Sequence, residues 1–258
     1  MNSKIIKPKR LYQEIGNKLY QELADGRYKI GDRLPPERDI AEKLSVSRAV
    51  VREALIMLEL MELVEVRQGS GVYVIKLPSV QPSAEHEEKS VDAEDAGPFE
   101  MMQARQLIES HIAEFAATQV TKSNIKQMRE ALDMERKNIE QGTADYDGDK
   151  MFHLAIAEAT QNSVLVDIVL NLWERRERSS MWKQLHSHIT DQTYREKWLG
   201  DHDRILAAIQ RRDSIEARQA MWQHLEHVKD TLMGLSEHGA PEFDGYLFNS
   251  NPVKISDS

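Results

Sequence analysis

The chain has 258 residues, no cysteine and a net charge of −9. This length suffices for two domains that each bury a core. The lack of cysteine excludes disulfides, thiolate catalysis and cysteine-ligated zinc. Because no run of about 18 apolar residues occurs, we expect a cytoplasmic protein that does not cross a membrane.

The charge is divided unevenly along the chain. Residues 1–78 contain 14 lysines and arginines against 11 aspartates and glutamates, which leaves 20 against 32 for the remainder. Local charge, rather than total charge, attracts phosphates. The N-terminal part can therefore bind DNA although the whole chain is acidic.

Two short helices joined by a tight turn are predicted between residues 34 and 60. Pro36 suits the first turn of a helix, where its missing N–H is not needed, and Ser47 can cap the second helix through its hydroxyl. In that helix Val51, Leu55 and Leu58 recur at spacings of four and three, which predicts one buried stripe. This arrangement places a helix in a DNA major groove.

A two-stranded wing is predicted after the second helix. Gly69 and Gly71 permit a sharp turn between segments 64–67 and 72–75, and the β-branched residues of these segments favour strands. A wing of this kind lies along the DNA backbone or minor groove. The helices and the wing together predict a winged helix-turn-helix domain.

Several basic residues surround the predicted motif. Any one arginine alone is better explained as a solvated surface residue, but four arginines around a winged helix-turn-helix indicate DNA binding. We expect Arg48 and Arg52 to discriminate bases, and Arg67 to hold phosphates with Lys9 and Arg10. The four arginines are Arg38, Arg48, Arg52 and Arg67.

The rest of the chain is predicted to be a linker followed by helices. Residues 77–98 combine prolines and serines with many carboxylates, as is typical of a flexible acidic linker. Apolar periodicity beyond it predicts an antiparallel bundle of about six helices. The predicted boundaries are 8–76 for the winged domain, 77–98 for the linker, 99–236 for the bundle and 237–258 for a disordered tail.

Two details of the bundle are predicted from local patterns. On its first helix, Leu107, Ile108, Ile112 and Phe115 form an apolar stripe that we expect to face the core. Farther along, Gly200 is expected to interrupt the helices. His202 would then begin the next helix.

A metal site is suggested by one aspartate and three histidines. Asp149 and His153 are four residues apart, so both project from one helix face, whereas His202 and His224 lie in two later helices. If they converge, one carboxylate and three imidazoles suit Zn²⁺, Ni²⁺ or Mn²⁺ and leave positions for a small ligand. Spacing alone is weak evidence, because nine histidines allow many combinations.

Other residues near this site have two explanations each. Arg105 and Glu109 form either an ordinary ion pair worth about 0.2–0.5 kcal/mol or a site in which Arg105 clamps a ligand carboxylate. Asn162 is a helix cap or an effector contact. His186 and His188 are placed between helices and outside the metal-ligand set.

The chain resembles the GntR-type regulators of the FadR subfamily, in which a winged helix precedes an all-helical domain of the FCD type that binds a ligand. The resemblance covers nearly the whole chain and rests on Leu34–Arg38, Ser47–Leu55, Gly69–Gly71, Arg105–Glu109 and the set Asp149, His153, His202 and His224. It implies that this set binds a divalent metal, with zinc first. It also implies DNA contacts for Arg38, Arg48 and Arg52, backbone contacts for Ser47 and Gly69, and a missing hydroxyl at Ala49.

Further motifs are similar to repressors of hexuronate utilisation, of the UxuR and ExuR type; they are Gly97–Glu100, Trp198–His202, Ala220–Glu226 and Phe243–Phe248. This resemblance implies a homodimeric repressor that binds a palindromic operator and is released by a metabolite of the glucuronate and galacturonate pathways, such as fructuronate. Two alternatives stay open: a metal-dependent hydrolase or isomerase with an appended DNA-binding domain, and a regulator that senses the metal itself.

Overall fold

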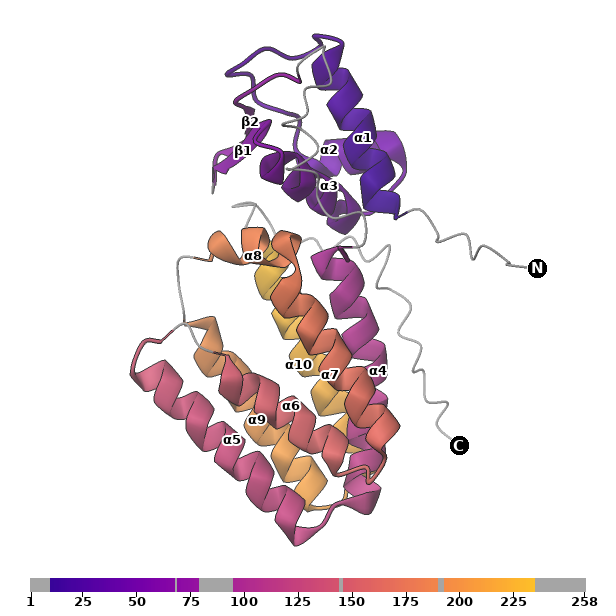
Figure 1. The fold of residues 1–258 in the computed structure, drawn as a ribbon, viewed down its shortest axis with the longest axis vertical. Helices are drawn as coiled ribbons and strands as arrows, with labels where there is room; N and C mark the ends of the chain where they lie inside the picture. Colours follow the sequence, from indigo (N-terminus) through magenta and orange to yellow (C-terminus); the bar gives the residue numbers. More distant parts are fainter. Residues whose placement is uncertain (1–9, 68, 79–94, 144–145, 190–192, 235–258) are drawn as a thin grey trace, which may run out of the picture. The chain divides into compact units, whose positions relative to one another are not determined.

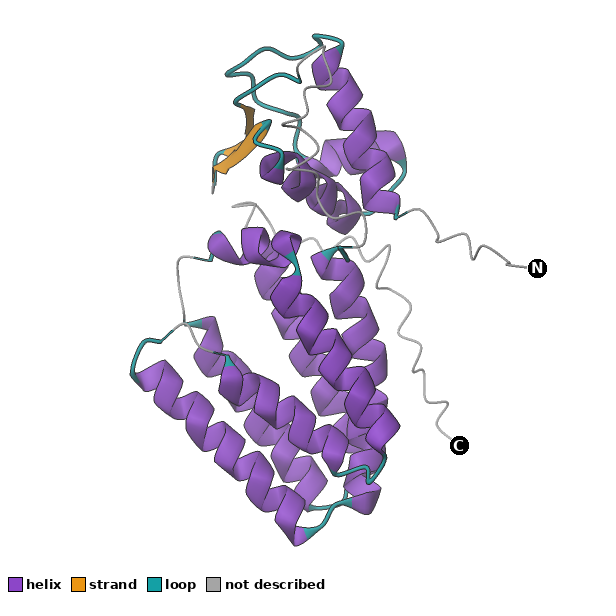
Figure 2. Cartoon of the chain, viewed as in Figure 1, coloured by secondary structure: helices purple, strands orange, loops and turns teal. Residues whose placement is uncertain are grey.

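The computed structural model describes residues 10–67, 69–78, 95–143, 146–189 and 193–234 (Figure 1). Within these ranges the chain is mostly helical, with one two-stranded antiparallel sheet (Figure 2). The expected combination of a winged helix-turn-helix with a helical domain is confirmed. None of the described helices is long and apolar enough to span a membrane.

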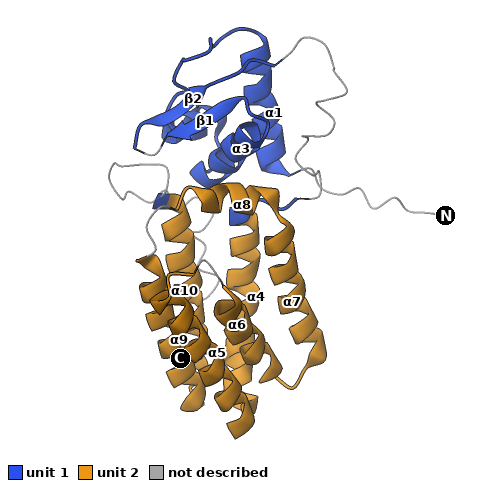
Figure 3. Cartoon of the chain, turned by 60° about the vertical axis from the view of Figure 1, so that its left-hand side comes forward, with its two compact units in different colours: residues 1–99, 234–258 blue, residues 100–233 orange. Residues whose placement is uncertain are grey.

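Contacts divide the chain into two units, residues 1–99 with 234–258, and residues 100–233 (Figure 3). Most of the predicted linker, at residues 79–94, lies outside the described residues, as does the whole predicted tail at 237–258. The boundaries proposed for these two segments stay predictions.

The first unit contains three helices and the wing. They are α1 (Leu11–Ala24), α2 (Glu37–Leu44), α3 (Arg48–Leu60), β1 (Val64–Arg67) and β2 (Gly71–Val74). The two strands pair in antiparallel register, with Val64 opposite Val74. The turn between them has Gly69 at φ +70° and Gly71 at φ +115°, values that favour glycine because it lacks a Cβ.

Helix α3 lies at the centre of this unit and packs on both α1 and α2. The Ser47 hydroxyl accepts a hydrogen bond from the backbone N–H of Val50 at 3.3 Å and so caps the helix. The predicted stripe of Val51, Leu55 and Leu58 is at most 2 % exposed. The cap and the stripe predicted for the second helix are both confirmed.

The second unit is a helical bundle. Its first helix begins at Pro98, two residues before the boundary between residues 99 and 100. Among the described residues it has seven helices, one more than the number expected. They are α4 (Pro98–Gln119), α5 (Lys122–Glu140), α6 (Asp147–Glu158), α7 (Ser163–Arg178), α8 (Ser180–Ser187), α9 (Tyr194–Gln210) and α10 (Ser214–Gly234).

Helix α8 is the additional helix, and it forms where the sequence predicted an interhelical segment. Ser179 caps it by accepting a hydrogen bond from the N–H of Trp182 at 3.0 Å, and Met181, Trp182 and Leu185 are buried. His186 therefore lies on a helix, and His188 follows it as the C-cap residue.

The predicted helix break near Gly200 is wrong. Helix α9 begins at Tyr194 and continues through Gly200, so His202 lies in its interior. A glycine inside a helix costs only about 1 kcal/mol. Burial of Trp198 and Ile205 on either side outweighs that cost.

The apolar stripe predicted on α4 is also wrong in part. Ile112 is buried, but Leu107 is 40 % and Phe115 is 42 % exposed. The buried face of this helix carries charged residues beside apolar ones: Arg105 and Glu109 are 3 % and 2 % exposed, and Met102 and Ala113 are also buried. The predicted apolar stripe and the buried face of α4 therefore overlap only in part.

Gly148 allows α6 to approach α5 closely. A Cβ at this position would lie 2.6 Å from the backbone nitrogen of Glu135 and 2.8 Å from its Cα. We expect Gly148→Ala to lower the free energy of unfolding by about 1–3 kcal/mol, because backbone must move. Gly200→Ala is the control: its Cβ would meet nothing within 4 Å, and alanine favours the helix interior by up to about 1 kcal/mol. Urea unfolding should show a lower free energy of unfolding for Gly148→Ala and an equal or higher one for Gly200→Ala. Equal changes in the two variants would contradict the close packing at Gly148.

Candidate functional site

The structure brings together the aspartate and the three histidines that the sequence singled out. Asp149 and His153 project from α6, His202 from α9 and His224 from α10, and all four side chains are buried. One ligand-capable atom from each lies within 4.8 Å of those of the others. Nε2 of His202 is 3.1 Å from Nε2 of His224, and Oδ1 of Asp149 is 3.3 Å from Nε2 of His153.

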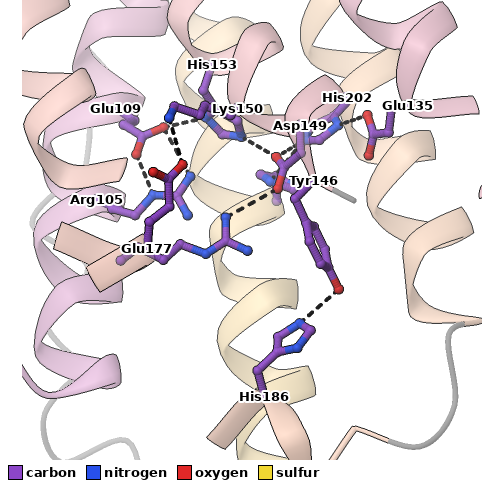
Figure 4. Close-up of polar contacts among 12 residues, drawn as sticks. Arg105, Glu109, Glu135, Tyr146, Asp149, Lys150, His153, Glu177, His186 and His202 are labelled. Carbon is purple, nitrogen blue, oxygen red and sulfur yellow. Dashed lines mark hydrogen bonds and ion pairs between the residues drawn. The ribbon is translucent and has the colours of Figure 1, made fainter. Parts of the chain in front are cut away.

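A carboxylate lies on the outer side of each imidazole, as Figure 4 shows for Glu109 beside His153 and Glu135 beside His202. Nδ1 of His202 hydrogen-bonds to Glu135 at 2.8 Å. Nδ1 of His153 hydrogen-bonds to Glu109, and Nδ1 of His224 lies 3.8 Å from Asp201. The hydrogen bonds to Glu109 and Glu135 fix the ring orientations of His153 and His202 and direct their other nitrogen inward. Nδ1 of His224 makes no hydrogen bond among the described residues. No sequence pattern indicated that these carboxylates, Glu109, Glu135 and Asp201, lie beside the histidines.

Burial and neighbouring charges set the protonation of this cluster. Burial and the adjacent His202 lower the pKa of His224 to about 3, so this imidazole is neutral. Burial also acts to lower the pKa of His153, but the carboxylates of Glu109 and Asp149 outweigh it and raise that pKa above 6.5. Since metals bind neutral imidazole, metal binding at His153 competes with protonation of this ring.

The donor set fits a divalent metal ion. Nε2 of His153 is buried without a hydrogen-bond partner among the described residues. Nε2 of His202 lies against Nε2 of His224, and a metal ion between these two nitrogens would be a better partner for both. One carboxylate oxygen and three imidazole nitrogens match the ligands that Zn²⁺ takes in proteins, and Ni²⁺ and Mn²⁺ accept them also.

Arg105 supports this cluster through Glu109. Its Nε donates to Oε1 of Glu109 at 2.6 Å, and its guanidinium lies 4.6 Å from the ring of Trp173. Burial alone would raise the pKa of the Glu109 carboxyl, but Arg105 and His153 lower it to about 2. The ion pair expected from the i, i+4 spacing is therefore present, buried, and linked to a histidine of the cluster.

Asn162 caps α7, accepting a hydrogen bond from the N–H of Val164 at 3.0 Å. This matches the simpler of its two explanations. Contact of Arg105 or Asn162 with an effector stays a prediction.

A cavity of about 340 Å³ lies close to Asp149 of the donor cluster. The two are connected by Arg176, which lines the cavity and lies 3.6 Å from Oδ2 of Asp149. The side chains around it come from α6, α7 and α8 and from Tyr146, which precedes α6. Lys150 and Glu177 form an ion pair of 2.7 Å among them, and Tyr146 hydrogen-bonds to His186 at 2.8 Å (Figure 4). The main lining residues are Tyr146, Lys150, Trp173, Arg176, Trp182 and His186.

The arginines of the winged unit differ in exposure. The side chains of Arg38 and Arg67 are 77 % and 52 % exposed, and Arg48 is partly exposed at the beginning of α3. Ala49 is 3 % exposed, so its methyl group belongs to the core.

Arg52 is buried, unlike the other three arginines. Its side chain is 3 % exposed, and it binds the carboxylate of Glu37 on α2 at two points, Nε to Oε1 at 3.0 Å and a terminal nitrogen to Oε2 at 2.7 Å. From the sequence, Arg52 was expected to discriminate bases together with Arg48, which precedes it by four residues. Here the side of α3 that carries Arg52 is covered by α2, so a base contact by Arg52 would require its separation from Glu37.

Two family models together cover most of the described chain. Residues 11–74 match bacterial regulatory proteins of the gntR family, and residues 100–227 match the FCD domain. The chain is also 53 % identical over 246 residues to the Uxu operon regulator of Haemophilus influenzae, which covers 95 % of this chain and 91 % of that protein. The chain belongs to the GntR family of bacterial regulatory proteins.

Other relatives of this GntR-family protein agree with that assignment. It is 50 % identical to the Uxu operon transcriptional regulator of Escherichia coli K12, over 96 % of this chain and 97 % of the relative. It is 46 % identical to the Exu regulon transcriptional regulator of the same strain, over 96 % and 95 %. The resemblance inferred from sequence motifs is confirmed: the chain is a DNA-binding transcription regulator and not an enzyme.

Proposed function

We propose that this GntR-family regulator represses genes of hexuronate catabolism in the cytoplasm. In this proposal it binds a palindromic operator, and a metabolite of the glucuronate or galacturonate pathway, such as fructuronate, releases it. The main support is the 46–53 % identity, over at least 95 % of the chain, with proteins named as regulators of the uxu operon and the exu regulon. The buried donor cluster beside a cavity supports a small-molecule effector.

The proposal includes a divalent metal, with Zn²⁺ first and Ni²⁺ or Mn²⁺ as alternatives. Asp149, His153, His202 and His224 would hold it. When bound, the metal supplies a positive charge and coordination positions for oxygen atoms of the effector. Glu109 and Glu135 would keep two of the imidazoles oriented toward it.

The arginine contacts proposed here are chosen by the exposure of each side chain. Arg48 is assigned to bases, Arg38 to bases or phosphates, and Arg67 to phosphates, because these side chains are at least partly exposed. Ser47 and Gly69 are assigned to the DNA backbone. Ala49 supplies no polar group, so one contact found in related regulators would be absent.

A homodimer is part of the proposal, because a palindromic operator presents two equivalent half-sites. The helical unit leaves large apolar side chains exposed on α4 and α7, which lie side by side (Figures 1 and 3). We assign the dimer contact to this surface, because large contiguous apolar patches mark sites of association. They are Leu107 and Phe115 on α4, and Val164 and Ile168 on α7, with exposures of 38–62 %.

The test is operator binding measured by fluorescence anisotropy with zinc-loaded, full-length protein. Fructuronate, glucuronate and galacturonate are compared with the uncharged sugars fructose, glucose and galactose, in buffer with and without a chelator. We expect a uronate to weaken operator binding by roughly 5–150-fold, the usual range of coupling between two sites. If no uronate changes operator affinity, the effector class is wrong. If zinc alone changes it without any uronate, the metal-sensing alternative is favoured.

A further inference from the structure

Arg176 is a buried cation held by aromatic rings. It lies on α7 and is 7 % exposed. The centre of its guanidinium lies 4.5 Å from the ring centroid of Trp173, 4.7 Å from that of Trp182 and 5.2 Å from that of Tyr146. Ring faces attract a guanidinium but do not replace the oxygen acceptors that its N–H groups require.

The guanidinium of Arg176 lacks the hydrogen bonds that other buried arginines make. Within the described part of the chain its charged partner is Asp149, whose Oδ2 is 3.6 Å from a terminal nitrogen, too far for a hydrogen bond. By contrast, Arg105 donates to Glu109 at 2.6 Å. The other oxygen of Asp149 lies 3.3 Å from His153, so Asp149 is shared with the donor cluster.

Arg176 lines the cavity of about 340 Å³ together with three other basic residues, Lys150, Lys183 and His186. Lys183 is exposed, so water can solvate its charge. Lys150 is paired with Glu177 at 2.7 Å. Burial, Arg176 and Arg195 lower the pKa of His186 to about 4, which leaves that imidazole neutral. A buried charge with incomplete hydrogen bonding is costly, and the carboxylate of a ligand in the cavity would supply the missing acceptors.

We propose that Arg176, held among Tyr146, Trp173 and Trp182, is the residue that binds the carboxylate of the effector, in place of Arg105. The inference rests on the proposed function, since it assigns the anionic group of that effector. A planar guanidinium can donate two parallel hydrogen bonds to one carboxylate. Because Asp149 is the present partner of Arg176, an incoming carboxylate would compete with it and so act directly on a residue of the donor cluster.

The main experiment compares Arg176→Met with Arg175→Met in the zinc-loaded, full-length protein. Arg175 is adjacent on α7 but exposed, and it hydrogen-bonds to Asn171 at 3.1 Å. Fructuronate affinity is measured by calorimetry and by release from the operator. We expect Arg176→Met to weaken fructuronate binding on the order of 100-fold and Arg175→Met to leave it unchanged. Arg176→Lys should be intermediate, because it keeps the charge and loses the planar fork.

Folding controls are needed because a variant that does not fold would lose fructuronate binding for an unrelated reason. Far-UV circular dichroism and one-to-one zinc binding show whether each variant is folded. If Arg176→Met does not fold, Arg176→Lys and Arg176→Gln replace it, and an unchanged fructuronate affinity in folded variants overturns the inference. A folded Arg105→Met that loses fructuronate binding, beside an Arg176→Met that keeps it, also overturns the inference.

A separate probe distinguishes failure of the carboxylate site from failure of the proposed function. If the wild-type protein binds fructuronate and Arg176→Met binds it equally, the assignment of Arg176 is wrong and the proposed function stands. If the wild-type protein binds no uronate, the proposed function fails, and acetate is then titrated while tryptophan fluorescence is recorded. Two tryptophan rings border Arg176, so an acetate response lost in Arg176→Met supports the anion site. No response in the wild-type protein overturns it.

Discussion

Replacing His202 with alanine is expected to weaken zinc binding by more than about 100-fold and to remove the response to uronates. His202 is fully buried, and its Nε2 lies 3.1 Å from Nε2 of His224 and 3.7 Å from Oδ1 of Asp149. Loss of a carboxylate that merely orients a ligand histidine typically costs about 10–100-fold in metal affinity. Loss of the imidazole itself should cost more.

Two further variants provide zinc affinities with which that of His202→Ala is compared. Glu135→Gln keeps His202 but replaces the carboxylate that hydrogen-bonds to its Nδ1 at 2.8 Å, so we expect a loss of about 10–100-fold. His111→Ala removes an exposed histidine of α4 and should change nothing. Competition with a chromophoric chelator gives the zinc affinities. Unchanged affinity and stoichiometry in His202→Ala would show that the four residues do not form the metal site.

Metal binding should also appear in the thermal stability of the fold. A ligand that binds only the folded state stabilises it in proportion to the logarithm of its concentration over its dissociation constant. Chelation should therefore lower the melting temperature of the wild-type protein and of His111→Ala, and leave that of His202→Ala nearly unchanged. An equal effect of chelator on all three proteins would place the stabilising metal elsewhere.

The features that the sequence predicted well depend on short spacings. Ser47 is followed three residues later by the N–H group that it caps, and Val51 and Leu55 are one helical turn apart. Asp149 and His153 are also one turn apart, so a single helix already places both on one face. Local geometry is sufficient for such elements, and their positions in the structure agree with it.

The features that sequence reasoning missed depend on which helix faces which. Glu135 and His202 are 67 residues apart, and no local pattern relates them. In α4 the apolar periodicity indicated the buried face only in part, because Ile112 is buried but the helix also turns Arg105 and Glu109 inward and leaves Leu107 exposed. A buried polar face has the same spacing as an exposed one, so the two are distinguished only by the neighbouring helices.

Replacing Arg52 with alanine is expected to lower the free energy of unfolding of the winged unit by about 3–5 kcal/mol, because the buried carboxylate of Glu37 would lose both hydrogen bonds from Arg52. Arg48→Ala should change that stability by less than about 0.5 kcal/mol. It should instead weaken binding to the specific operator by about 1–3 kcal/mol. The two arginines lie one turn apart on α3, but Arg52→Ala is expected to lose stability and Arg48→Ala to lose operator binding.

The positions of the four tryptophans allow the stability change to be assigned to one unit. Trp173, Trp182, Trp198 and Trp222 all lie within residues 100–233. Tryptophan fluorescence therefore follows the helical unit, whereas amide hydrogen exchange in α3 follows the winged unit. Arg52→Ala should speed exchange in α3 and leave the fluorescence transition in place, and the double variant with Glu37→Ala should recover part of the loss. If Arg52→Ala keeps α3 protected but loses operator discrimination, Arg52 leaves Glu37 to read a base, as its sequence position first indicated.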